Sequence, residues 1–308
     1  MYTVTAFYQF IPIQDLKMTE ELFSSLAKTN EMNGLVIIAP EGFNATVAAP
    51  SMEKLNHFKE NLLKHFSLES INFKDSTSEF APFRKFQIKI REEIVTLNTP
   101  HLVPDKAQKN HHLSPTQWNQ VLKSGEKFKM IDTRNWYETK IGTFKGAVNP
   151  GIDVFTEFPK FIAQQTIEKD EKLLIFCTGG IRCEKGILQL QEAGYDKVFQ
   201  LDGGIINYLK EYPNDQFEGE CFVFDHRVAV DQNLNPSKTY DLCPHCGQPG
   251  LQYVVCKRCD SHQVVCDDCL KLDWKKDTCS KHCAHQLELH PTRKGKKQIH
   301  PWRDTRQV

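Results

Sequence analysis

Residues 173–183 read LLIFCTGGIRC, and this stretch decides the fold of the central part of the chain. Four apolar residues in a row, Leu173–Phe176, are typical of a strand buried on both faces of a parallel sheet. Gly179 and Gly180 predict a tight turn, and Glu184–Glu192 has the spacing of a helix. The order strand, turn, helix predicts an α/β domain in which Cys177 lies at the sheet edge where such domains bind ligands.

Further strands and helices alternate around this stretch, across residues 113–215. Ser114 is a capping residue followed by proline, which predicts the start of a helix. The other expected elements are the strands Lys129–Asp132 and Val198–Leu201 and the helices Val154–Ile162 and Ile205–Glu211. This alternation predicts a parallel sheet that is covered by helices on both faces.

Residues 1–97 predict a separate α+β domain. Its expected strands are Val4–Phe10, Leu35–Ala39, Ala45–Ala49, Ile71–Phe73 and Phe86–Ile90, and its expected helices are Met18–Lys28 and one that Ser51 caps. The order β-α-β-β-α-β favours a ferredoxin-like sandwich. Residues 98–112 are polar and predict a linker with exposed histidines at 101, 111 and 112.

The C-terminal third has a different composition. We expect an extended connector over residues 216–239, a cysteine-rich module over 240–286 and a basic tail over 287–308. No apolar run approaches the roughly 20 residues that span a bilayer. The N-terminus lacks the pattern of a signal peptide. Formal net charge is zero, which gives no sign of a DNA partner. These features predict a cytoplasmic protein without a membrane partner.

The loop Cys177–Cys183 predicts a reactive thiol. Its residues Thr178, Gly179, Gly180 and Ile181 allow successive N–H groups to point inward, the next helix adds its positive end, and Arg182 adds a cation. All three favour the thiolate of Cys177. The alternative is a buried structural cysteine beside a glycine turn. Cys183 either resolves a persulfide on Cys177 or packs inertly in the first turn of the helix, and the sequence leaves both open.

Three motifs in order carry a resemblance to rhodanese domains: Ile131–Arg134 with Glu138, Ile141–Ala147, and Leu201–Ile205 around the loop of Cys177. The resemblance implies that Cys177 attacks a sulfur donor and holds a persulfide. Asp132, Arg134 and Glu138 are then supports of the loop rather than catalysts. Arginine follows the cysteine after four residues, whereas related phosphatases have five, so phosphatase activity is not expected.

The chain also resembles one narrower family over nearly its whole length. The segments Gly34–Thr46, Asp132–Asn135, Cys177–Lys185 and Cys221–Val228 look like those of rhodanese-related tRNA uridine hydroxylases. This resemblance implies hydroxylation of the wobble uridine to 5-hydroxyuridine, with tRNA as partner and molecular oxygen as co-substrate. The residues alone do not reach that reaction, because no flavin, nicotinamide or iron motif is present.

Two other functions stay open at this point. A sulfurtransferase or persulfide carrier would share the loop, with a sulfur donor or a reductant as its partner. A non-enzymatic zinc-containing adaptor for RNA or protein would need only the C-terminal module. The intact Cys177 and Arg182 argue against the adaptor, and the additional domains argue against a plain sulfurtransferase.

Eight cysteines near the C-terminus predict metal binding. They form four pairs with the short spacing of zinc ligands: Cys243 and Cys246, Cys256 and Cys259, Cys266 and Cys269, Cys279 and Cys283. Two pairs complete one tetrahedron, so the module is expected to hold two structural zinc ions. The spacing leaves open whether neighbouring or alternate pairs share an ion.

Overall fold

The computed structural model describes residues 1–104, 111–292 and 294–295 and divides the chain into two compact units. Met1–Asp225 and Val230–Asn235 form the first unit, and His226–Ala229 with Pro236 onward form the second. The first unit contains a five-stranded sheet in the N-terminal domain and a four-stranded sheet in the central domain, together with smaller two-stranded pairings. Each unit is described by itself below.

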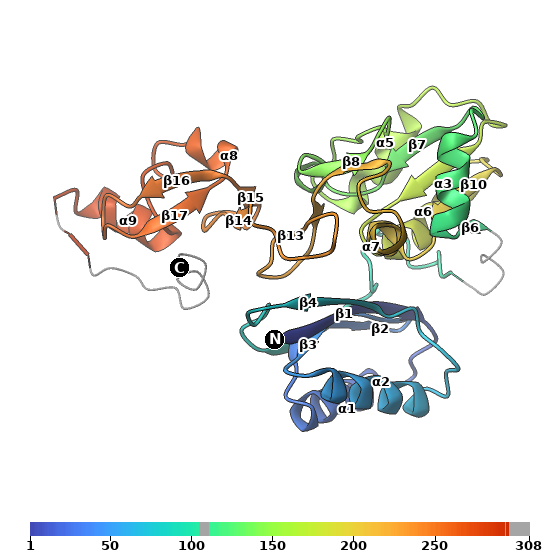
Figure 1. Ribbon diagram of the computed structural model, residues 1–308, viewed down its shortest axis with the longest axis horizontal. Helices are drawn as coiled ribbons and strands as arrows, with labels where there is room; N and C mark the ends of the chain where they lie inside the picture. Colours follow the sequence, from blue (N-terminus) through green and yellow to red (C-terminus); the bar gives the residue numbers. More distant parts are fainter. Residues whose placement is uncertain (105–110, 293, 296–308) are drawn as a thin grey trace. The chain divides into compact units, whose positions relative to one another are not determined.

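The N-terminal domain is a five-stranded sheet with two helices on one face (Figure 1). Its strand order is β4-β1-β3-β2-β5, which is the ferredoxin-like order with β5 added in parallel beside β2. The strands are β1 (Tyr2–Phe10), β2 (Asn33–Ala39), β3 (Gly42–Ala49), β4 (Lys74–Ser78) and β5 (Phe86–Ile90), and the helices are α1 (Leu16–Thr29) and α2 (Met52–His65). The predicted ferredoxin-like sandwich is confirmed.

Aromatic side chains form the core between this sheet and its helices. Phe7, Phe23, Phe43 and Phe58 are all buried, and their rings pack edge-on or tilted against one another. Phe7 lies on β1, and the neighbouring residues of that strand point to the opposite face of the sheet. That opposite face carries none of the domain's helices (Figure 1).

One expected strand of the N-terminal domain is wrong. Ile71–Phe73 is not a strand, because the N–H of Phe73 bonds to the carbonyl of Ile71 and turns the chain before the ladder begins. The apolar side chains at 71 and 73 pack on the core instead. The fourth strand therefore begins at Lys74, a charged residue that periodicity did not select.

The central domain contains a four-stranded sheet with every neighbouring pair parallel. The order is β6-β10-β9-β7, with β6 (His112–Leu113), β7 (Lys129–Asp132), β9 (Leu173–Phe176) and β10 (Val198–Leu201). Leu173 and Ile175 belong to one hydrophobic cluster, and Leu174 and Phe176 belong to another. Both faces of β9 are therefore buried, as the apolar run predicts.

Helices and short strands lie between these strands and after the last of them. They are α3 (Pro115–Lys123), α4 (Trp136–Thr139), β8 (Gly142–Phe144), the 3-10 helix η2 (Phe155–Glu157), α5 (Phe158–Ala163), α6 (Ile181–Glu192), α7 (Gly204–Glu211), β11 (Phe217–Gly219), β12 (Cys221–Phe222) and β13 (Ala229–Val230). Ser114 caps α3 in a capping box with Gln117. The single helix expected from Val154 is thus split into η2 and α5. Helix α6 begins three residues earlier than expected, directly after Gly180.

The predicted exposed histidines fall into two groups. His101 is exposed, as expected, whereas His111 and His112 are half-buried. His111 bonds to the carbonyl of Val198, and His112 begins β6 and bonds to Glu184. The polar composition of residues 98–112 predicted a linker with exposed histidines, and a two-residue strand is too short for its sequence to reveal.

The second unit consists of short strands and two helices. They are β14 (Asp241–Leu242), β15 (Pro249–Gly250), β16 (Gln252–Val255), β17 (His262–Val265), α8 (Asp267–Leu270) and α9 (Lys281–Leu289). The predicted basic tail lies mostly outside the described residues, although Lys294 is described and pairs with Asp260 at 2.7 Å. No helix in the described chain is both long and apolar enough to cross a membrane.

Candidate active site and candidate metal centres

Cys177 lies at the carboxyl end of β9, where the loop turns into α6. Its side chain is buried, and its Sγ accepts a hydrogen bond from the N–H of Gly180 at 3.1 Å. Gly180 caps α6 with φ of +98°, a conformation that strongly favours glycine. The loop therefore places the sulfur at the positive end of a helix.

The surroundings of Cys177 favour its ionised form. Burial raises the pKa of this thiol, but the hydrogen bond from Cys183 and the charge of Arg182 act in the opposite direction. Backbone N–H groups of Arg182 and Gly180 act with them, and the pKa of Cys177 falls to about 6. The sulfur is thus a thiolate at neutral pH, which is the nucleophilic form.

Arg182 is held by Glu138 rather than left free. The two guanidinium nitrogens Nη1 and Nη2 lie 2.7 and 2.8 Å from the two carboxylate oxygens of Glu138, in a bidentate pair. Both residues are buried. Burial lowers the pKa of Arg182, but the charge and hydrogen bond of Glu138 together with the charges of Cys177 and Asp132 raise it more, so the pKa is raised and the guanidinium stays charged. Glu138 therefore fixes the cation of the loop and offsets much of its charge.

Asp132 and Arg134 form a second buried ion pair. Their closest atoms, Arg134 Nη2 and Asp132 Oδ2, are 2.6 Å apart, and both side chains are fully buried. The same guanidinium donates to the carbonyl of Gly142, and Thr143 donates to Asp132. This pair joins the end of β7 to β8 and has no contact with the sulfur of Cys177 among the described interactions. The geometry of this ion pair is that of a group that holds the loop in place.

Cys183 lies in the first turn of α6, buried next to Cys177. Its Sγ is 3.6 Å from the hydroxyl of Thr133, which itself donates to the carbonyl of Phe176. Burial raises the pKa of Cys183, and the hydrogen bond to Cys177 raises it further. Cys183 is therefore a thiol that donates to the Cys177 thiolate.

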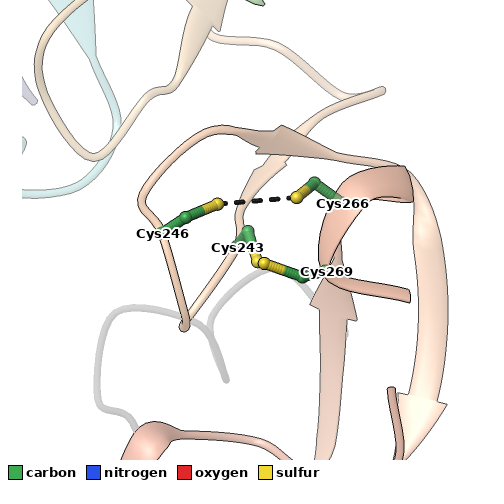
Figure 2. Close-up of side chains that lie close together, drawn as sticks. All are labelled: Cys243, Cys246, Cys266 and Cys269. Carbon is green, nitrogen blue, oxygen red and sulfur yellow. Dashed lines mark hydrogen bonds between the residues drawn. The ribbon is translucent and has the colours of Figure 1, made fainter. Parts of the chain in front are cut away.

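In the second unit, the eight paired cysteines form two clusters of four. Cys243, Cys246, Cys266 and Cys269 make one cluster, shown in Figure 2, and Cys256, Cys259, Cys279 and Cys283 make the other. The first and third cysteine pairs thus share one cluster, and the second and fourth pairs share the other. The spacing alone had left open whether neighbouring or alternate pairs combine. Within each cluster the sulfur atoms all lie within 4.8 Å of one another.

The sulfur geometry fits a tetrahedral metal ion. Four thiolates around zinc at its usual bond length place neighbouring sulfurs about 3.8 Å apart. In the first cluster, Cys246 and Cys266 are separated by 3.5 Å (Figure 2). In the second, Cys279 lies 3.5 Å from both Cys259 and Cys283. Each cluster is therefore a complete set of four soft ligands, and seven of the eight thiols are buried, with Cys246 of the first cluster exposed.

Comparison with known proteins matches the three parts of the chain to three family descriptions. Residues 2–94 match the UPF0176 acylphosphatase-like domain, residues 115–211 the rhodanese-like domain, and residues 218–284 the rhodanase C-terminal domain. A relative from Bdellovibrio bacteriovorus, named tRNA uridine(34) hydroxylase, is 58% identical over 98% of this chain and 86% of its own length. The chain belongs to the tRNA uridine(34) hydroxylase family.

More distant members of the hydroxylase family agree. A relative of the same name from Acinetobacter baylyi is 38% identical over 88% of this chain and 85% of its own length. Another, from Synechococcus elongatus, is 38% identical over 84% of this chain and 96% of its own length. The resemblance seen in the sequence is thereby confirmed, as is the combination of a ferredoxin-like, a rhodanese-like and a cysteine-rich region.

The solved structures compared with this family member each cover about a third of its chain. A human single-domain sulfurtransferase covers 33% of this chain and 97% of its own length, at 21% identity and a TM-score of 0.29. A rhodanese-like domain protein from Staphylococcus aureus covers 32% of this chain and 89% of its own length, at 23% identity and a TM-score of 0.28.

Sequence reasoning missed the residues that the N-terminal domain of this family member brings to the loop. The hydroxyl of Tyr8 donates to Glu184 at 2.6 Å. Lys185 is fully buried between two carboxylates, Glu41 at 2.8 Å and Glu93 at 2.5 Å. Burial raises the pKa of Glu93, but the hydrogen bond and charge of Lys185 together with two backbone N–H groups lower it more, so the pKa falls. No periodicity or spacing links residues so far apart in sequence.

Proposed function

We propose that this protein hydroxylates the wobble uridine of tRNA to 5-hydroxyuridine in the cytoplasm, with Cys177 as the essential residue. The observation that carries the proposal is the 58% identity over nearly the whole chain to a relative named tRNA uridine(34) hydroxylase. The intact loop supports it, because Cys177 has the low pKa and the hydrogen-bond donors of a reactive sulfur. We take molecular oxygen as the co-substrate.

The stoichiometry of this reaction requires a further partner. Insertion of one oxygen atom into the C5–H bond of uridine and reduction of the other atom to water consume two electrons. A separate reductant must deliver these two electrons. The loop also suits a sulfur donor: the Cys177 thiolate attacks the outer sulfur of a donor persulfide, forms Cys177–S–S⁻ and releases the donor thiolate, a redox-neutral step that does not replace the reductant. The N–H of Gly180 and the neighbouring Arg182 would stabilise such an anionic sulfur.

The two cysteine clusters are proposed to hold one structural zinc ion each. Four thiolates that fill all four positions around the ion are the pattern of zinc that stabilises a small domain rather than zinc that performs chemistry. Among the described residues neither cluster includes a histidine or carboxylate. The ions would connect alternate cysteine pairs and so fix the short strands and helices of the second unit.

The test uses cells that lack this gene and measures wobble nucleosides of their tRNA by mass spectrometry. The cells are complemented with wild type, with Cys177→Ala or with Cys221→Ala. Cys221 is the matched control: it is a buried free cysteine of the same unit, and burial raises its pKa to about 12. We expect wild type and Cys221→Ala to restore 5-hydroxyuridine and Cys177→Ala to fail.

The same loop favours one second candidate, a sulfurtransferase or persulfide carrier. A low-pKa cysteine with inward N–H donors is all that sulfur transfer from a donor needs. If deletion leaves 5-hydroxyuridine unchanged and no parallel pathway makes it, this candidate replaces the hydroxylase. Purified protein supplied with ¹⁸O₂, tRNA and a reductant separates the two directly, because only the hydroxylase places the label in uridine.

A further inference from the structure

Two side chains of the N-terminal sheet lie against the glycine pair of the Cys177 loop. Lys74 is paired with Ala6 across β4 and β1, and Tyr8 lies two residues further along β1 on the same face of the sheet. A Cβ atom at Gly179 would be 3.7 Å from Cδ of Lys74, and one at Gly180 would be 3.0 Å from the hydroxyl oxygen of Tyr8. The helix-free face of the N-terminal domain therefore covers the loop.

The ammonium group of Lys74 is buried, and within the described part of the chain it forms no ion pair with a carboxylate. Its side chain is 3% exposed, and its Nζ donates to the carbonyl of Asn72 at 3.1 Å. The same Nζ lies 4.8 Å from the ring centroid of Tyr8. Among the described residues, no carboxylate oxygen lies within 4.0 Å of this ammonium group. A buried charge in this state is costly unless another anion nearby compensates it.

Several charges face Lys74 from the elements packed around it. Burial lowers the pKa of Lys74 to about 8. Three anionic groups oppose that shift and one cation adds to it; the anions are Asp202 after β10, Cys177 after β9 and Glu184 on α6, and the cation is Lys210 on α7. Glu184 is already bonded to Tyr8, His112 and Gln200. Cys177 is the reactive anion of this group.

The ion pair of Arg182 with Glu138 allows a second cation to add to the stabilisation of the Cys177 thiolate. Both of its terminal nitrogens are bonded to Glu138, so the pair as a whole carries little net charge. We propose that Lys74 is a charge-stabilising residue of the Cys177 site, contributed by the N-terminal domain, whose ammonium group stabilises the anionic sulfur across Gly179 and Gly180. This inference rests on the proposed function only in that Cys177 is the reactive sulfur.

The test measures the alkylation rate of Cys177 against pH in the full-length, metal-loaded protein. Peptide-level mass spectrometry separates Cys177 from the other cysteines, and no tRNA is needed, so the outcome is independent of the hydroxylase test. In Lys74→Met the pKa of Cys177 should rise, which lowers the rate at pH 6 by about three- to tenfold. In Lys74→Arg, which keeps the charge, the rate should stay within about twofold of wild type.

Lys169→Met is the matched control. Lys169 also lies over a tyrosine ring, 3.7 Å from the centroid of Tyr195, and donates to a backbone carbonyl, but it is exposed. This control should leave the profile of Cys177 unchanged. A folded Lys74→Met protein with the wild-type profile, or an equal change in Lys169→Met, would overturn the proposal.

A second measurement keeps the proposal testable if Lys74→Met does not fold. In wild type, Lys74 loses its proton near its pKa of about 8. The Cys177 thiolate, already formed, then becomes less stabilised and more nucleophilic, so its rate should rise a second time. Arginine stays charged there, so Lys74→Arg should lack this second rise. A second rise that persists in Lys74→Arg contradicts the inference.

Discussion

The thiols of the Cys177 loop and all but one of the thiols in the two cysteine clusters are buried, but the groups around the sulfur atoms differ. In the loop, one sulfur faces an N–H group, a thiol and a cation. In the clusters, each sulfur faces three other sulfurs. The first arrangement stabilises a single thiolate and leaves it reactive, whereas the second can be stable only when a metal ion shares the negative charge. Residue type is the same and burial differs only at Cys246, so the groups that surround each sulfur decide its chemistry.

Metal removal should have the largest effect and should separate the two regions. The binding free energy of a structural zinc site is roughly 10 kcal/mol or more, so a chelator should unfold the described part of the second unit. Hydrogen exchange measured by mass spectrometry should show lost protection over residues 236–292. Cys177 should still titrate near pH 6. Retained protection after complete metal removal would contradict the structural role of the ions.

Replacement of Arg182 should have the next largest effect. Arg182→Gln leaves Glu138 buried without its partner, which should lower the free energy of unfolding by about 3–5 kcal/mol. The loss of the cation should also raise the pKa of Cys177. Urea denaturation and the alkylation profile measure the two effects.

The double variant Arg182→Gln/Glu138→Gln sharpens this result. It removes a pair of little net charge, so stability should recover and the pKa of Cys177 should return toward its wild-type value of about 6. If the pKa of Cys177 stays raised in the double variant, Arg182 alone stabilises the thiolate. The contribution of Lys74 is then small.

A smaller effect is expected from Phe224, which presents an aromatic face beside the loop. Its side chain is 57% exposed, and the guanidinium carbon of Arg182 lies 5.9 Å from its ring centroid. If a uridine reaches Cys177, its base can stack on this ring, so Phe224→Ala should weaken tRNA binding by roughly tenfold. Phe224→Tyr should not.

Tyr253→Ala is the control for that measurement, because Tyr253 is an exposed aromatic residue of the cysteine-rich unit. Filter binding with an anticodon stem-loop compares the three variants. Equal affinities for Phe224→Ala and wild type would exclude a stacking role for Phe224.

Replacement of Cys183 should have the smallest effect. Cys183→Ala removes one hydrogen bond to the Cys177 thiolate, worth about 1 kcal/mol, so the alkylation rate at pH 6 should fall by about threefold. Cys183→Ser retains a donor and should still restore 5-hydroxyuridine in complemented cells. A complete loss of the modification in Cys183→Ser would instead show that Cys183 acts as a resolving nucleophile.

The sequence by itself determined the local features of this protein. The apolar run Leu173–Phe176 and the glycine turn after it predicted the buried strand and the position of Cys177, because strand burial and turn geometry depend on neighbouring residues. The four cysteine pairs likewise follow from spacing alone. Ile71–Phe73 shows the limit of this reasoning. Its apolar side chains pack on the core, as those of a strand would, but its backbone forms a turn.

Only the tertiary structure decided which distant residues meet. It grouped alternate cysteine pairs into each cluster, placed Glu138 on Arg182, and brought Tyr8 and Lys74 to the loop. These contacts depend on how sheets and loops pack, and they join residues separated by tens of positions or more. Side-chain periodicity reports only which face a residue occupies, so it contains no information about the partner on the other side.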